Sequence, residues 1–304
     1  MAAAQQPTAE LGLASHVECS GLTLEAANGR GFALRELSFT LERGALRPLL
    51  GPAGSGKTSL LRVIAGLVRP HSGQVRVDGL ELSLASEAEL RELRRGSVGL
   101  ASSAGPALRG SVASNVELPL RLTGVPVGRA RRRAADLLAL TGLEEMAAVR
   151  AERLPPLASI RTAIAVALAH EPGLLLLDEL AVALDLDERE ELIDVLRRLH
   201  RNLGLTLLIA TRDASLARRI GGEVRMREGR IVSELVRRSA FSRGEGERTD
   251  ELAILDRDGR VEIAPDQREA LGIGRRARVT NEGDHVGVWP DRPPPDPRPP
   301  WRRQ

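Results

Sequence analysis

The chain has 304 residues, of which 42% are hydrophobic and 28% charged, a balance that excludes an intrinsically disordered protein and predicts a soluble globular one. The sequence pI is near 10.1 but the net charge is only +3, and with a single lysine and no tyrosine the high pI is not a sign of nucleic-acid binding. One cysteine, Cys19, excludes an internal disulfide framework and fits a reducing compartment, and no apolar run reaches the length of a membrane span.

The first part of the chain contains a tail and two short strands. Residues 1–15 lack the basic start and apolar core of a secretory signal, and we expect a flexible tail there. Strand-like runs at residues 22–24 and 37–41 flank a turn-rich segment. A folded domain is therefore expected from residue 16 onward.

The next segment is rich in glycine and lies between an apolar run and an apolar-periodic helix. It reads Gly51, Pro52, Ala53, Gly54, Ser55, Gly56, Lys57, Thr58 and Ser59. Four free positions separate the first glycine from Gly-Lys-Thr, the pattern of a phosphate-binding loop. In such a loop, backbone N–H groups and a helix N-terminus converge on an anion. We predict that residues 51–59 hold the phosphates of a nucleotide, with Lys57 on the terminal phosphates and the Thr58 hydroxyl on Mg²⁺.

Composition supports this assignment of Lys57. It is the only lysine among 44 lysine and arginine residues. A lysine presents a compact point charge, whereas an arginine presents a broad planar one. A lone lysine at the one position that needs a compact charge indicates a nucleotide site rather than a chance glycine-rich turn.

Helices and strands alternate after the loop. We expect helices at 59–67, 85–95, 129–140, 159–170 and 188–203, strands at 75–77, 98–101, 174–177 and 205–210, and a loop from 102 to about 116. Four leucines at 174–177 precede Asp178 and Glu179, as in a buried parallel strand that ends at a site. We predict that Asp178 belongs to the Mg²⁺ shell and that Glu179 polarises the attacking water. The alternation predicts an α/β domain with a mostly parallel core sheet over residues 16–236.

The C-terminal part differs in composition. Residues 237–250 are predicted to be a linker, and residues 251–289 a small β-rich module. Residues 290–304 hold seven of the 18 prolines and are expected to be a disordered tail.

The order of motifs across residues 17–235 resembles the ATP-binding-cassette (ABC) ATPases. The residues that carry the resemblance are 51–61, 71–79 (His-Ser-Gly-Gln-Val-Arg-Val-Asp-Gly), 161–172, 174–179 and 183–185 (Ala-Leu-Asp). It implies a P-loop NTPase fold with a helical subdomain, ATPase activity, and ATP and Mg²⁺ as cofactors. Residues 116–125 look most like the lipoprotein-release and macrolide-export branch.

Several positions depart from the family pattern. The signature Leu-Ser-Gly-Gly-Gln falls on Leu154, Pro155, Pro156, Leu157 and Ala158. In the family this loop offers a hydroxyl and N–H groups to the γ-phosphate held by the opposite subunit. Prolines have no N–H and Leu157 blocks close approach, so this loop is predicted not to hold phosphate.

Three further family residues are replaced. The glutamine that links Mg²⁺ to the transport partner falls near Ser102 or Ser103, and the switch histidine is Arg212, which cannot shuttle a proton. No aromatic residue stands at 26–28, where the family stacks adenine, and Phe32 is a candidate substitute.

The resemblance and its departures together imply an asymmetric transporter subunit. We expect it to bind Mg·ATP, to hydrolyse it weakly alone, and to pair with a second ABC ATPase subunit and a membrane permease, the heterodimer being favoured over a homodimer. It would be cytoplasmic and peripheral at the inner face of the plasma membrane. The alternative is a regulatory ATP-binding protein without a transport role, associated with DNA through its C-terminal module.

That module resembles the AbrB-type swapped-hairpin domains, which pair as dimers and in many cases bind DNA. The segments concerned are 255–265, 267–273, 278–280 and 285–289. Five arginines there are nearly balanced by five acids, so dimerisation or docking is expected rather than DNA binding.

Overall fold

The computed structural model describes residues 15–26, 31–102, 109–238, 248–253, 269–270, 272–273, 277–281 and 286–290. The chain divides into two compact units, Met1–Leu252 and Ala253–Gln304. The boundary between the two units therefore falls two residues beyond the end of the predicted linker 237–250. Most of that linker, Ser103, and nearly all of the predicted tails 1–15 and 290–304 lie outside the described residues.

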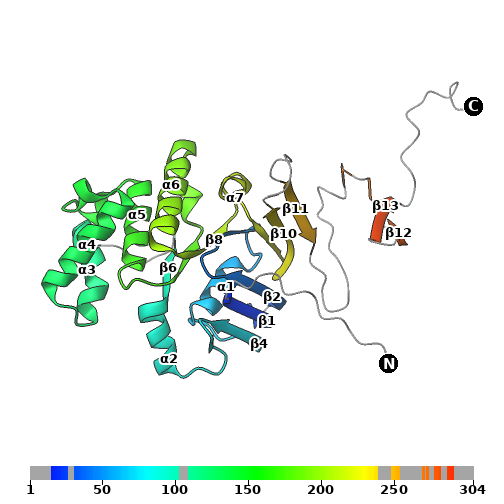
Figure 1. Ribbon diagram of the computed structural model, residues 1–304, viewed down its shortest axis with the longest axis horizontal. Helices are drawn as coiled ribbons and strands as arrows, with labels where there is room; N and C mark the ends of the chain where they lie inside the picture. The colour runs from blue at the N-terminus through cyan, green and yellow to red at the C-terminus, as the bar shows by residue number, and fades with distance from the viewer. Residues whose placement is uncertain are drawn as a thin grey trace, which may run out of the picture. The chain divides into compact units, whose positions relative to one another are not determined.

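A seven-stranded sheet forms the centre of the first unit, in the order β11-β10-β9-β3-β8-β7-β6 (Figure 1). Its strands are β3 (Leu46–Leu50), β6 (Val98–Ser102), β7 (Leu174–Asp178), β8 (Thr206–Thr211), β9 (Val224–Arg227), β10 (Arg230–Arg238) and β11 (Arg248–Ala253). The pairs from β9 to β6 are all parallel, and β10 runs antiparallel to β9. The mostly parallel core sheet is thus confirmed.

Strand β7 shows why the central strands are apolar along their whole length. Its four leucines are all buried, on both faces of the sheet. Its register places Asp178 beside Ala210 of β8 and Ser102 of β6. The polar residues that follow these strands therefore meet at one edge of the sheet.

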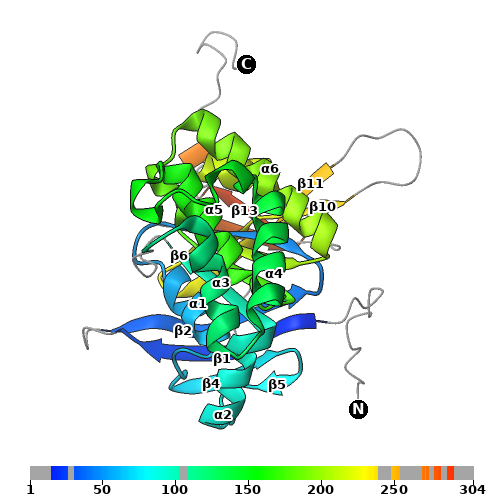
Figure 2. The same cartoon turned by 90° about the vertical axis from the view of Figure 1, so that its left-hand side faces the viewer.

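Helices cover the sheet and form a separate layer at one end of the unit. They are α1 (Lys57–Ile64), α2 (Glu87–Glu92), α3 (Val112–Leu122), α4 (Val127–Thr141), α5 (Pro156–Ala167), α6 (Leu186–Leu203) and α7 (Ala214–Ile220). Helices α3 and α4 lie side by side and pack against α5 (Figure 2). Among the described residues, no helix is long and apolar enough to cross a membrane.

The loop predicted to reach residue 116 ends earlier, which corrects the sequence-based expectation. Helix α3 begins at Val112 because Ser111 caps it, its hydroxyl accepting the Ser114 N–H at 3.1 Å. The serines that suggested a loop are therefore a helix-start signal.

A second, antiparallel sheet has the order β2-β1-β4-β5. Its strands are β1 (Ser15–Glu25), β2 (Phe32–Glu42), β4 (Ser72–Val77) and β5 (Leu80–Glu81). The buried His16 of β1 joins it to the core, with Nδ1 2.6 Å from Thr206 Oγ1 and Nε2 3.1 Å from Asp78 Oδ1. Burial lowers the pKa of this histidine, which acts as a packing residue.

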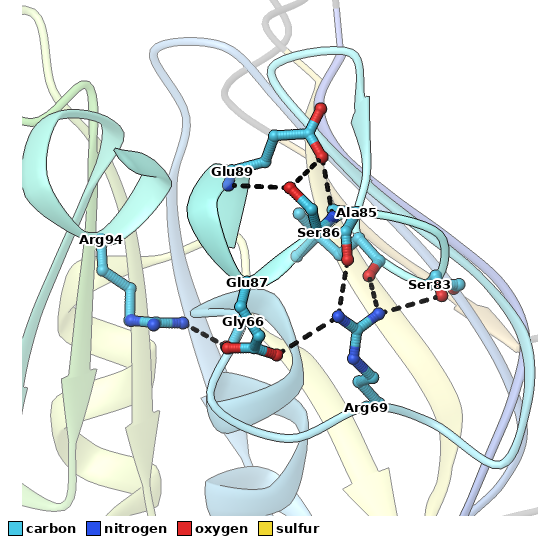
Figure 3. A network of polar contacts seen from close by, with 9 residues as sticks. Gly66, Arg69, Ser83, Ala85, Ser86, Glu87, Glu89 and Arg94 are labelled. Atoms are coloured by element: carbon cyan, nitrogen blue, oxygen red, sulfur yellow. Dashed lines mark hydrogen bonds and ion pairs between the residues drawn. The ribbon is translucent and has the colours of Figure 1, made fainter. Parts of the chain in front are cut away.

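Two arginines fix the segment that follows α1 (Figure 3). Arg69 donates to the carbonyls of Ser83 at 3.2 Å and Ala85 at 2.6 Å, and Arg94 donates to the Gly66 carbonyl at 2.6 Å. These bonds attach the chain just after the C-terminal end of α1 to residues 83–85 and to Arg94.

In the second unit, β12 (Ala277–Asn281) and β13 (Val286–Pro290) form an antiparallel pair. Most of the predicted module 251–289 lies outside the described residues, including the whole of segment 255–265 of the AbrB-like pattern.

Candidate nucleotide-binding site

The phosphate loop connects the end of β3 to the start of α1 and borders a cleft of about 1070 Å³. Residues 53–59 line this cleft, together with Glu179 and Arg212. Gly51 and Pro52 contribute their carbonyl oxygens, which accept hydrogen bonds from Lys57. The structure therefore brings the predicted phosphate residues and the predicted base together.

Backbone packing explains the glycine at position 56. Gly56 has a φ of 101°, and a Cβ there would lie 2.3 Å from the carbonyl oxygen of Ala33 in β2. Gly54, with a φ of 77°, has nothing within 4 Å of the equivalent position. Neither the Gly54 nor the Gly56 N–H makes a hydrogen bond to another described residue. These N–H groups, at the N-terminus of α1, suit an anion.

This difference between the two glycines gives a stability prediction. Gly56→Ala should lower the free energy of unfolding by at least about 3 kcal/mol, because backbone strain and a backbone clash add. Gly54→Ala, the matched control, should cost about 1–2 kcal/mol, the strain of a left-handed alanine. Urea unfolding without nucleotide measures both, and equal losses would contradict the packing described here.

Lys57 is the most buried charged group of the cleft, with 4% of its surface exposed. Its ammonium donates to the carbonyls of Gly51 at 2.7 Å and Pro52 at 3.0 Å, and lies 3.1 Å from Glu179 Oε1. The Ser55 hydroxyl, 3.4 Å from the ammonium, is a fourth and longer contact. An ammonium has three N–H donors, and these four partners occupy them. A phosphate that binds Lys57 must therefore replace one of them.

Thr58 and Asp178 form a pair of oxygen ligands. The Thr58 hydroxyl donates to Asp178 Oδ1 at 3.0 Å, close to the edge of roughly 2.9 Å in an octahedron with Mg–O bonds of 2.0–2.1 Å. Burial raises the pKa of Asp178, the Thr58 hydrogen bond opposes this, and the charge of Glu179 adds to the rise. No group of three or more His, Cys, Asp or Glu ligands occurs among the described residues, and Mg²⁺ with phosphates needs only one or two protein ligands.

Glu179 has an unusual backbone conformation directly after β7. Its φ is 54°, in the left-handed region, and its N–H donates to the Ala210 carbonyl of β8 at 3.0 Å. Its second carboxylate oxygen, Oε2, lies 3.1 Å from Arg212 Nε. The sequence singled out both residues but contains no signal that they pair, because the contact depends on the register of β7 and β8.

The positions of the family signature form the start of a helix. Pro155 is the N-cap of α5 and Pro156 its first residue, where proline is well tolerated because its missing N–H would have no partner. Leu157 is 8% exposed and belongs to the hydrophobic core beneath α5. Pro156, Ser159 and Ile160 line the cleft, so its wall there is mainly apolar.

The remaining predicted positions are partly described. Phe32 is 49% exposed and lines the cleft beside Ala26 and Ala33. Residues 27–30, including Asn28, and Ser103 lie outside the described residues. Apolar residues that sequence reasoning missed, Leu180 and Val182, come from the turn after Glu179.

Comparisons with known proteins agree with this geometry. A family model described as ABC transporter matches residues 34–182. The methionine import ATP-binding protein MetN of Caulobacter vibrioides is 35% identical over 261 residues, covering 85% of this chain and 76% of that protein. MetN of Thermobifida fusca is 41% identical over 189 residues, covering 62% and 59%. For MetN of Leifsonia xyli, 35% identical, the alignment spans 72% of this chain but 65% of the relative, less than two thirds of its length.

Solved structures show the same relationship. The dimeric ATP-binding cassette MJ0796 bound to ADP and Pi has a TM-score of 0.64 at 28% identity, covering 72% of this chain and 97% of that one. CbiO1 from Clostridium perfringens, part of an ABC transporter complex, has a TM-score of 0.67 at 26% identity, covering 72% and 88%. With 35% identity to a MetN protein over 85% of its length, and a fold in common with solved ABC cassettes, the chain belongs to the ABC transporter family as one of its ATP-binding proteins.

Proposed function

We propose that this chain is the ATP-binding subunit of an ABC transporter and that it binds Mg·ATP in the cleft beside residues 51–59. The observation that carries the proposal is the arrangement of Lys57, Thr58 and Asp178, which places a buried cation and two oxygen ligands at one glycine-rich loop. Lys57 would hold the terminal phosphates, and Thr58 and Asp178 would hold Mg²⁺. When bound, Mg²⁺ neutralises charge on the phosphates.

Hydrolysis is proposed to depend on Glu179 and on a second subunit. Glu179 would orient and polarise the attacking water from its place at the end of β7. The segment 154–158 offers no N–H at Pro155 or Pro156 and buries Leu157, so it would supply little to a partner's γ-phosphate. An asymmetric pair with a related subunit that carries an intact signature would complete one site.

The partner on the membrane is proposed to be a permease subunit, and the chain to be peripheral at the cytoplasmic face. The named relatives are methionine import proteins, and CbiO1 is part of a transporter complex. The comparisons give no support to the lipoprotein-release branch, the AbrB-like module or a DNA-associated regulatory role. We propose a permease partner but name no transported solute, because the nucleotide cleft does not determine which solute is transported.

Two measurements test this proposal directly. The purified chain should bind Mg·ATP in a calorimetric titration, and it should co-purify with a permease when both are produced together. A chain that bound no Mg·ATP would refute the nucleotide site. A chain that bound Mg·ATP but no permease would refute the transport assignment alone.

Phe32 is proposed to support the adenine ring. Base–aromatic stacking contributes about 1–3 kcal/mol, so Phe32→Ala should weaken Mg·ATP binding by roughly 5- to 150-fold. Binding of Mg·tripolyphosphate, which has no base, should change little and serves as the control. Equal weakening of both ligands in titrations would show that Phe32 acts on the fold of the cleft instead.

A further inference from the structure

Both carboxylate oxygens of Glu179 are held by cations from different elements. Oε1 lies 3.1 Å from Lys57 Nζ in α1, and Oε2 lies 3.1 Å from Arg212 Nε after β8. The two cations differ in surroundings, since Lys57 is almost fully buried and Arg212 is 47% exposed. Glu179 thus connects Lys57, the proposed phosphate ligand, to Arg212 at the rim of the cleft.

The backbones on either side of this link are fixed. The Glu179 N–H is bound to Ala210, as described above, and the Gly51 N–H donates to the Thr211 carbonyl at 3.2 Å. The Thr211 hydroxyl accepts the Asp213 N–H at 3.0 Å, and Asp213 caps α7. Any exchange of partners at Glu179 must therefore come from side-chain movement.

Lys57 must release a partner to accept a phosphate oxygen. The Gly51 and Pro52 carbonyls belong to the loop itself, whereas Glu179 and Ser55 can leave by turning their side chains. Of these two, Glu179 carries the negative charge that an arriving phosphate repels. The released carboxylate would then face phosphate oxygens and Asp178, all negatively charged. A charge that loses its partner in a partly buried site is costly, unless another cation keeps it paired.

We propose that Arg212 is a positioning residue that keeps Glu179 paired while a nucleotide phosphate takes Lys57. This inference rests on the proposed function of the cleft. The exchange of partners requires only that some phosphate group reach Lys57. Arg212 therefore assists the binding of a nucleoside diphosphate as well as that of a triphosphate. It acts through Glu179, and its contribution disappears when Glu179 carries no charge.

A double-mutant cycle with Mg·ADP tests this dependence. ADP is not hydrolysed and has no γ-phosphate, so a direct contact between Arg212 and that group does not enter. Arg212→Gln in the full-length chain should weaken Mg·ADP binding about fivefold, the upper range for a partly exposed ion pair. In the Glu179→Gln background the same change should alter the affinity less than about twofold.

The chain offers a closely matched control pair. Arg76 Nε lies 3.1 Å from Glu81 Oε2, with exposures of 53% and 16%, against 47% and 19% for Arg212 and Glu179. The pair joins β4 to β5 and does not line the cleft. Arg76→Gln and Glu81→Gln, alone and together, should leave Mg·ADP affinity unchanged, and thermal melting of every variant checks the fold.

Two results would overturn the inference while leaving the nucleotide site in place. One is that Arg212→Gln lowers the affinity for Mg·ADP equally in the unaltered chain and in the Glu179→Gln background, which would mean that Arg212 contacts the nucleotide directly. The other is no loss in either background. If the unaltered chain bound no Mg·ADP at all, the proposed function would fail together with the inference.

Discussion

Replacing Lys57 by alanine should weaken the binding of Mg·ATP at least about 100-fold, because it removes a buried cation and leaves Glu179 without one of its two partners. The remaining carboxylate would then repel the phosphates that the ammonium had attracted. Isothermal titration calorimetry of the purified chain measures the change. No other residue in the chain is a lysine, so no second ammonium can take over.

Lys57→Arg provides the companion variant. It keeps the positive charge but replaces a compact ammonium, bound by two loop carbonyls, with a planar group that does not fit that position. We expect nearly the same loss of affinity from it. Melting temperatures without nucleotide control for misfolding, and a well-folded Lys57→Ala chain with unchanged affinity would disprove the site.

The purified chain should hydrolyse ATP at least about 100-fold more slowly than a cassette with an intact Leu-Ser-Gly-Gly-Gln loop in the same assay. Loss of a single preorganised donor costs about 10²–10³ in rate, and two copies of this chain would each meet a loop with prolines at Pro155 and Pro156. Phosphate release at saturating Mg·ATP is the measurement. Adding a related subunit with an intact loop should raise the rate.

Glu179→Gln separates this slow activity from contamination. Any residual turnover that belongs to the chain should fall further in this variant, whereas a contaminating ATPase would be unaffected. Turnover equal to that of an intact cassette, and abolished by Glu179→Gln, would contradict the proposed asymmetry.

The sequence predicts the parts of the site that depend on local pattern. The phosphate loop is one continuous segment, and the four leucines of β7 with the two acids after them are another. In the structure Glu179 lines the same cleft as the loop, and Asp178 accepts a hydrogen bond from Thr58. The mostly parallel sheet is predictable because strands buried on both faces, as β7 and β8 are, appear in the sequence as continuous apolar runs.

The features that the sequence does not reveal depend on approaches between distant elements. The Ala33 carbonyl beside Gly56, and the meeting of Glu179 with Arg212, arise from strand register and from a left-handed backbone at Glu179. The start of α3 is different, because the capping Ser111 is visible in the sequence but also resembles a loop residue.

Leu157 limits how this chain could be rebuilt into a symmetric cassette. A glycine at that place would open the approach to the backbone N–H that Leu157 now covers, yet it would also leave a cavity in the helical layer formed by α3, α4 and α5. Losing a buried leucine and introducing a helical glycine together cost about 3–6 kcal/mol, a large share of the stability of an ordinary domain. A repair confined to the loop would therefore loosen the layer that holds the loop, and a successful one must refill that space from neighbouring helices.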